Sequence, residues 1–135
     1  MSWEYISGFF DADGSITLSV LSKGKNKTPV LSFHNNEISI LEEIKEFILS
    51  ELNVVGFIVH KKSKKETHND SYSLSYKYFP KVIMIMSKLN IKHPKKKHRY
   101  EIILKLYELT KRNGKYSEEE LTKKLDMENL FWLHQ

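Results

Sequence analysis

The feature that most constrains this chain is the change of residue pattern across residues 6–14. An apolar stretch with small residues, Ile6–Phe10, runs into Asp11-Ala12-Asp13-Gly14 and then into strict alternation over Ser15–Val20. Such alternation is typical of a half-buried strand, and glycine can end a helix by adopting the left-handed conformation. The pattern therefore predicts a helix over residues 3–12, stopped by Gly14, with a strand directly after it.

The two acids at the end of this predicted helix lie where the helix already carries partial negative charge. A positive group is therefore expected beside Asp11 and Asp13, and a bound divalent cation is the most economical choice. A calcium loop of the EF-hand type starting at Asp11 is excluded, because its sixth and twelfth positions hold Ile16 and Ser22 where glycine and glutamate are required. This stretch is thus a candidate site as well as a helix end.

Composition favours a single intracellular domain over residues 1–135, which is long enough to bury a core. The chain has no cysteine, so disulfides and thiolate metal sites are excluded. We find no secretory signal and no apolar run of membrane-spanning length, and so expect no membrane partner. The cytoplasm of a prokaryote and an organelle both fit.

The charge is unevenly distributed. Lys and Arg number 22 against 17 Asp and Glu, a net charge of +5. No acid lies between Asp13 and Glu37 or between Asp70 and Glu101. These acid-free stretches include segments that alternate like strands, and a basic sheet face without acids suits a polyanion. A solvated basic surface without a partner is the alternative.

Periodicity predicts the element order αββαββα followed by further helices, an α+β arrangement in which helices cover one face of an antiparallel sheet. Pro29 indicates an edge strand or the start of a strand, and Asn35 or Asn36 is expected to cap the second helix. The predicted strands are residues 15–21, 28–35, 54–62 and 71–78, and the later helices are 38–52, 80–89, 97–110 and one or two within 117–133.

The predicted strands leave one face of short hydroxyls among basic side chains. Ser and Thr can donate to or accept from any base, so this face suits contacts in a nucleic-acid groove, although it also fits the solvated side of a half-buried sheet. The candidate nucleic-acid-binding residues are Thr17, Ser19, Lys23, Lys25, Ser32, His34, Lys61, Ser71, Ser73, Ser75 and Lys77.

Residues 6–14 resemble the nine-residue motif of the LAGLIDADG family of homing endonucleases. Gly8, Asp11, Asp13 and Gly14 stand at the signature positions, and the element order is similar over residues 3–110. The resemblance implies a saddle-shaped, four-stranded antiparallel sheet with helices on one face plus C-terminal helices. One motif is present, and family members with one motif act as homodimers in which the two motif helices cross.

Spacing also suggests which residues meet at such an interface. Ser7, Gly8 and Asp11 fall on one helix face with Ala12, where small side chains let a partner helix approach. Packing within the monomer is the alternative for Ser7 and Gly8.

The resemblance further implies the catalytic residues. Asp13 is the expected metal ligand, with the backbone carbonyl of Ala12 beside it, whereas Asp11 is expected mainly to cap or pack the helix junction. Glu37 falls where the family carries a polar active-site residue, so it could orient the attacking water or bind metal. An acid that interacts with the helix dipole is the alternative for Glu37.

A basic residue near the phosphate completes the set. Lys96, with Lys95 and Lys97 as close rivals, matches the family's catalytic lysine ahead of a helix. Where some relatives place an arginine, this chain has Leu41, and Arg99 or Lys97 could substitute. The expected cofactor is Mg²⁺, with Mn²⁺ or Ca²⁺ able to replace it in binding.

These observations favour a homodimeric, magnesium-dependent endonuclease that cuts both strands of a long, pseudo-palindromic DNA site, and the resemblance implies that it is intron-encoded. Two alternatives stay open: a maturase that binds its intron RNA and assists splicing, and a non-catalytic DNA-binding regulator. An HNH nuclease built on His34-Asn35-Asn36 is excluded, because it needs further histidines at defined spacing.

Overall fold

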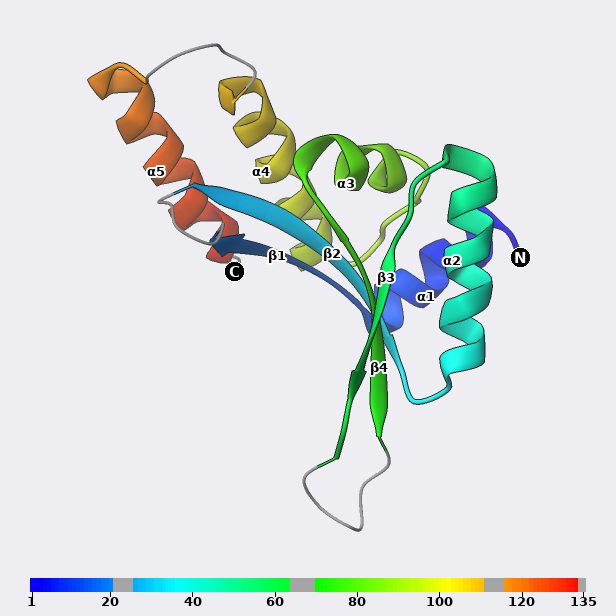
Figure 1. Ribbon diagram of the computed structural model, residues 1–135. Helices are drawn as coiled ribbons and strands as arrows, with labels where there is room; N and C mark the ends of the chain where they lie inside the picture. The colour runs from blue at the N-terminus through cyan, green and yellow to red at the C-terminus, as the bar shows by residue number, and fades with distance from the viewer. Residues whose placement is uncertain (21–25, 64–69, 111–115, 134–135) are drawn as a thin grey trace. The chain divides into compact units, whose positions relative to one another are not determined.

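The computed structural model describes residues 1–20, 26–63, 70–110 and 116–133 (Figure 1). The chain divides into two compact units, residues 1–91 and residues 92–135, which we describe separately. The helices and strands are α1 (Trp3–Asp13), β1 (Gly14–Val20), β2 (Lys27–Asn35), α2 (Ile38–Leu52), β3 (Phe57–Lys61), β4 (Ser71–Lys77), α3 (Phe79–Met86), α4 (Pro94–Thr110) and α5 (Glu118–Trp132).

The first unit is built on one four-stranded sheet in the order β1-β2-β4-β3, with every neighbouring pair antiparallel. The helices α1, α2 and α3 contact these strands and lie together on one side of the sheet (Figure 1). The predicted α+β arrangement with helices on one face is therefore confirmed.

The core lies between that sheet and the three helices. Phe33 on β2 packs edge-on against Phe10 of α1 at 5.7 Å between ring centroids and against Tyr76 of β4 at 6.5 Å. From α2, Ile44 and Ile48 are fully buried. Each such side chain contributes about 1.5–3 kcal/mol of transfer free energy, so the apolar spacing of α1 and α2 fixes which of their faces meets the sheet.

Pro29 is the third residue of β2, near the start of the strand, which is one of the two positions expected for it. The strand β2 is an interior strand, but β4 pairs with it only from Val30 onward, so Pro29 pairs with Leu18 of β1 alone. Proline has no backbone N–H to donate, and it is tolerated at this end of β2 because no second strand pairs with it there.

The second unit consists of α4 and α5, which contact each other. The guanidinium of Arg99 lies over the rings of Phe131 and Trp132, at 5.2 and 5.0 Å from their centroids. A buried ion pair joins Lys124 and Glu128 at 3.2 Å. Residues predicted to form one or two helices after residue 117 form the single helix α5, which Ser117 and Glu120 begin with a capping box.

No helix in the described part of the chain is long and apolar enough to cross a membrane.

Candidate nucleic-acid interface

The junction between α1 and β1 contains no linker, and Gly14 makes this possible. The backbone of Gly14 is extended, with φ −96° and ψ 165°, so the left-handed conformation suggested by the sequence is wrong. A Cβ atom at Gly14 would instead lie 2.7 Å from the carbonyl oxygen of Phe10 and overlap the Phe10 ring. Glycine is needed here for close approach, and it fixes the end of α1 directly against the sheet.

Asp13 is the last residue of α1 and is exposed. No hydrogen bond or ion pair joins its side chain to another residue in the described part of the chain. Gly14 pairs with Phe33, so Asp13 lies where α1 meets the end of β2. An unpartnered carboxylate at the negative end of a helix is electrostatically unfavourable by itself, which makes a cation its natural complement.

The donors at this helix end fit part of a magnesium site. Asp13 offers carboxylate oxygens and Ala12, which is also exposed, a backbone carbonyl; Mg²⁺ takes one or two carboxylates and keeps several waters. Among the described residues no cluster of three or more His, Asp or Glu side chains could hold a metal ion. Asp11 differs from Asp13 in being half-buried.

Strand register places most of the predicted nucleic-acid-binding residues on the sheet face opposite the helices, because alternate residues of paired strands share a face. We call this the open face. His34 pairs with Ser73 and Ser32 with Ser75 across β2 and β4. The predicted residues on the open face are Thr17, Ser19, Ser32, His34, Lys61, Ser71, Ser73, Ser75 and Lys77. Lys23 and Lys25 lie outside the described residues.

Hydrogen bonds between side chains cross this face from strand to strand. The His34 ring joins Ser15 of β1 through Nε2 at 3.0 Å and Ser73 of β4 through Nδ1 at 2.9 Å. The hydroxyls of Ser32 and Ser75 lie 2.9 Å apart. The hydroxyls are thus held in a row, which reduces the entropy lost when a ligand orders them.

The strands themselves contain no acid, and Lys61 and Lys77 are exposed on the open face. Asp70, directly before β4, is engaged: Ser63 N–H donates to one of its oxygens at 2.8 Å, and His60 Nε2 lies 2.8 Å from the other. The hydrogen bond from Ser63, followed by that from His60, lowers the pKa of Asp70. Asp70 therefore ties the ends of β3 and β4 together.

Sequence reasoning missed five apolar or hydroxyl members of the open face, namely Ser15, Thr28, Val30, Phe57 and Val59. Phe57 pairs with Ser75 and Val59 with Ser73, so both point to the same side as the serines. Both are exposed, at 69% and 56%. Their register relative to Lys61, which the sequence did place on this face, was the available signal.

Ser7 is buried, with 7% of its surface exposed. Its hydroxyl donates to the Trp3 carbonyl at 2.7 Å and accepts from the Asn90 backbone N–H at 2.9 Å. The Ser7 side chain therefore packs within the monomer, which was the alternative to a place at the dimer interface.

Gly8 lies differently: it is exposed, and a Cβ atom there would meet nothing within 4 Å. The exposed stripe of α1 runs through Tyr5, Gly8 and Ala12. A helix face with only a hydrogen and a methyl at its centre leaves room for another backbone.

Glu37 is the N-cap residue of α2, a position expected for Asn35 or Asn36, and that expectation is wrong. The Glu37 backbone N–H donates to Asn35 Oδ1 at 2.8 Å, and the Glu37 side chain makes no capping hydrogen bond. The carboxylate is exposed. It is thus available at the end of β2 for a ligand, although its place at the positive end of α2 is favourable without one.

Lys96 belongs to the second unit and lies in the first turn of α4, since the helix begins at Pro94 and not at residue 97. Proline has no backbone N–H, and at the first helical position an N–H would have no partner within the helix. The first turn holds Lys95, Lys96 and Lys97 and no acid. Three cations at the positive end of a helix repel, so an anion such as a phosphate would stabilise them.

The departure at Leu41 has a structural reason. Leu41 is fully buried in the core of the first unit, so it faces away from any ligand. Arg99, one of the two possible substitutes, is stacked on the aromatic rings of α5.

The first unit is thus an α+β protein with helices on one face of an antiparallel sheet, an acid-free polar face opposite them, and an unpartnered carboxylate at the helix-to-strand junction. The LAGLIDADG-like domain family matches residues 2–124, and the chain belongs to this family. Comparison with curated protein sequences gives no match.

Solved structures of homing endonucleases have a similar fold. I-TnaI matches with a TM-score of 0.70 at 18% identity, over 100% of this chain and 90% of that protein. The meganuclease I-AabMI, bound to uncleaved DNA, matches with a TM-score of 0.67 at 17% identity, over 95% of this chain and 44% of that protein. The archaeal intron-encoded I-Vdi141I, complexed with DNA, gives 0.66 at 19% identity, over 94% and 79%.

Proposed function

We propose that this chain is a metal-dependent homing endonuclease that acts as a homodimer and cuts both strands of a long, pseudo-palindromic DNA site. The observation that carries the proposal is Asp13: an exposed, unpartnered carboxylate at the end of α1, continuous with the strand that begins the open face. Family membership and the DNA complexes of similar folds support the same activity.

The open face would bind duplex DNA. Its hydroxyls and His34 can donate to or accept from base edges, and Lys61 and Lys77 can neutralise phosphates. A carboxylate on these strands would repel the phosphates, and the strands carry none. The exposed part of this face, which carries His34, Lys61 and Lys77, therefore suits a polyanion.

The metal would be Mg²⁺, with Mn²⁺ or Ca²⁺ able to occupy the site in binding. When bound, such an ion supplies an activated water, neutralises charge on the phosphate and assists the departing oxygen. Asp13 and the Ala12 carbonyl would hold it, and Asp13 of a second copy would bring a further carboxylate. A dimer through the exposed stripe at Gly8 would bring the two helix ends together.

Two further side chains would act on the phosphodiester. Glu37, exposed at the end of β2, would orient the attacking water and accept its proton. Lys96, with Lys95 and Lys97 beside it, would neutralise the negative charge that grows on the phosphate. This assignment requires the two units to work as one domain over residues 1–135, in an intracellular protein encoded within an intron.

The decisive test is cleavage of the intron-lacking allele of the host gene with and without Mg²⁺. We expect wild-type protein to make a double-strand break only with the metal. Asp13→Asn should lose that cleavage by at least about a hundredfold, the scale on which removing a group that acts at the transition state is felt, while binding in Ca²⁺ changes only a few-fold.

Glu46→Gln is the matched control, because Glu46 is an exposed acid on α2, on the helix-covered side of the sheet. It should cut like wild type. Cleavage by Asp13→Asn at the wild-type rate would refute the metal assignment. Tight binding of DNA or intron RNA by the wild type without any cleavage would favour the regulator or the maturase instead.

A further inference from the structure

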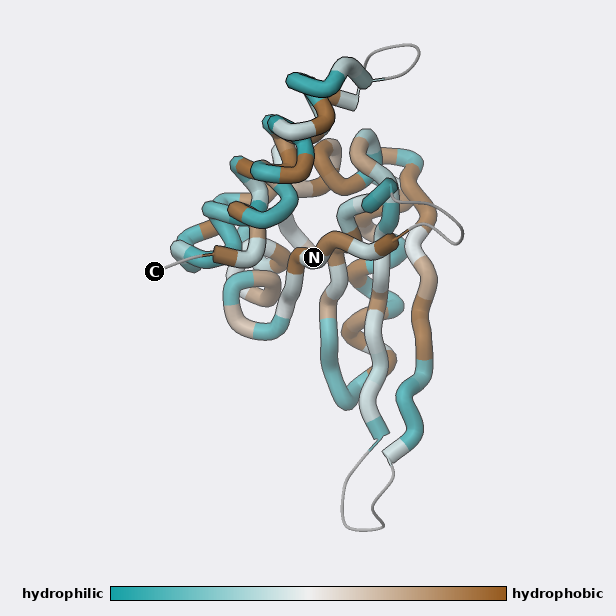
Figure 2. The backbone as a smooth tube through the Cα atoms, turned by 90° about the vertical axis from the view of Figure 1, so that its left-hand side faces the viewer, coloured by the Kyte–Doolittle hydropathy of each residue, from teal (hydrophilic) through white to brown (hydrophobic). Residues whose placement is uncertain are grey.

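The open face carries one apolar region that the proposed chemistry does not use. Val55, Phe57, Val59 and Tyr78 form it, and we call it the apolar patch. All four are about half exposed or more, with Phe57 the most exposed at 69%. Figure 2 shows that β3 is hydrophobic along its first part and hydrophilic toward its end, beside the paler β4.

The patch lines a groove of about 460 Å³ together with Ser75, Lys77 and Lys81. Tyr78 has φ 77°, a conformation that non-glycine residues rarely adopt, and Lys81 Nζ lies 5.9 Å from its ring centroid. Such backbone strain costs about 1–3 kcal/mol and persists mainly at ligand sites. The backbone of Tyr78 is therefore held in an unfavourable conformation at the apolar patch.

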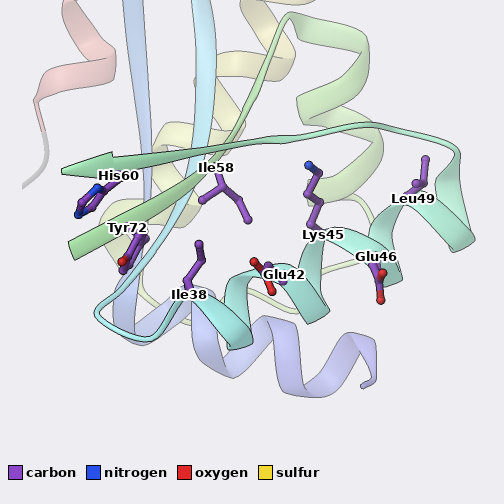
Figure 3. A pocket seen from close by; sticks show the side chains of 8 residues that line it. All are labelled: Ile38, Glu42, Lys45, Glu46, Leu49, Ile58, His60 and Tyr72. Carbon is purple, nitrogen blue, oxygen red and sulfur yellow. The ribbon is translucent and has the colours of Figure 1, made fainter. Parts of the chain in front are cut away.

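Two grooves described in the first unit are lined by different charges. A groove between α2 and the β3–β4 pair is lined by Glu42 and Glu46 as well as Lys45 and apolar side chains (Figure 3). The groove at the apolar patch has lysines and no acid. Its occupant should combine negative charge with small apolar groups, which duplex DNA does: the thymine 5-methyl group is exposed in the major groove beneath the phosphates.

We propose that Phe57 and Val59 are specificity-determining residues that select A·T base pairs by contact with thymine methyl groups. The inference rests on the proposed function in that the open face must bind duplex DNA. Phe57 and Val59 lie directly across from Ser75 and Ser73, so a duplex bound by those serines would cover both side chains. Burying them against methyl groups removes apolar surface that the free protein leaves in water.

The experiment starts from a randomised duplex library, from which wild-type protein selects a site in Ca²⁺. In the selected duplex each thymidine is then replaced singly by deoxyuridine, which removes only the methyl group. We expect a loss of roughly fourfold in affinity at one or more thymidines, the factor that one buried methylene-sized group contributes. Val59→Ser and Phe57→Ser, which leave no methyl group or ring to touch the thymine methyl, should each abolish that loss at particular positions.

Leu49→Ser is the control, because Leu49 is an exposed apolar residue on α2, away from the open face. It should keep the full sensitivity to deoxyuridine. Val59 and Phe57 are both exposed in the free protein, so neither serine variant removes a buried core side chain, and circular dichroism checks that both stay folded.

Three results would overturn the inference. Affinity that is unaffected by deoxyuridine at every position would overturn the inference, but it would leave the proposed binding of duplex DNA standing. A sensitivity that survives in both variants would also do so. If instead Phe57→Ser changes only the oligomeric state in sedimentation, the patch is a contact between chains, since β3 is an edge strand. Failure of the wild type to select any duplex would overturn the proposed function itself.

Discussion

Single residues decide how the motif helix meets the sheet. Gly14 is required because a Cβ atom there would overlap the Phe10 ring and carbonyl oxygen, and the Ser7 hydroxyl is hydrogen-bonded to the backbone of Trp3 and Asn90. Neither role is visible from spacing. The helix repeat places Ser7 beside Asp11 and Gly8 beside Ala12, but only packing shows that the first side chain turns inward and that Gly8 remains open.

Gly14→Ala should destabilise the protein by about 1–3 kcal/mol, because the added methyl group has no space and either Phe10 or the strand must move. Gly8→Ala is the matched control: nothing lies within 4 Å of its new methyl, and replacing a helical glycine should stabilise the monomer by roughly 0.5–1 kcal/mol. Urea unfolding at concentrations where sedimentation finds only monomer measures both. Equal midpoints for the two variants would contradict the close-approach explanation.

At the scale of elements, strand register decides which side chains share the open face, whereas composition only suggested it. The pairing of β2 with β4 brings His34 to Ser73 and Ser32 to Ser75, residues about forty positions apart in the chain, into hydrogen-bond contact. The pairing of β3 with β4 adds Lys61, Phe57 and Val59 to the same face. A slip of one residue would turn all of these side chains toward the helices.

Lys61→Ala should weaken DNA binding and reduce the slope of log affinity against log salt by about 0.9, the contribution of one neutralised phosphate. Lys45→Ala is the control, because Lys45 lies on α2 away from the open face, and it should leave the slope unchanged. Gel-shift titrations over a range of salt concentrations measure both slopes. An unaltered slope for Lys61→Ala would remove that residue from the phosphate contacts.

At the scale of the whole molecule, the proposed metal site depends on how two copies of the chain meet. Asp13 and Ala12 lie at the end of α1, and the exposed stripe through Tyr5, Gly8 and Ala12 runs along the same helix. A second copy docked on this stripe would double the carboxylates. The proposed pair of Asp13 carboxylates therefore depends on the proposed dimer.

Gly8→Leu should weaken dimerisation at least tenfold, since a branched side chain at the centre of the stripe keeps the two backbones apart. Sedimentation equilibrium measures the constant, and thermal unfolding checks that the monomer stays folded, as the open space around Gly8 leads us to expect. Tyr5→Ser, at the margin of the stripe, should have a smaller effect. A dimer of unchanged strength in Gly8→Leu would locate the interface elsewhere.

Much of the fold could be predicted because it depends on local periodicity. The bounds predicted for α2 agree with Ile38–Leu52, and the alternation at Ser71–Lys77 predicted β4 and its polar side. The predictions were weakest at ends: β3 is confined to Phe57–Lys61, and α4 starts at Pro94, so the lysines lie inside the helix. Ends depend on pairing partners and on single backbone geometries.

By itself the sequence determined the order of elements, the acid-free strands and the position of Asp13 at a helix end, because these follow from residue type and from neighbours close in the chain. Only the tertiary structure decided that Ser7 turns inward, that Gly14 is needed for space, and that Phe57 and Val59 share a face with the serines. Each of these depends on contact with a distant segment. The spacing of Phe57, Val59 and Lys61 groups them on one face of β3. Apolar residues occur on both faces of this strand, however, so only the pairing with β4 decides which face lies beside the serines.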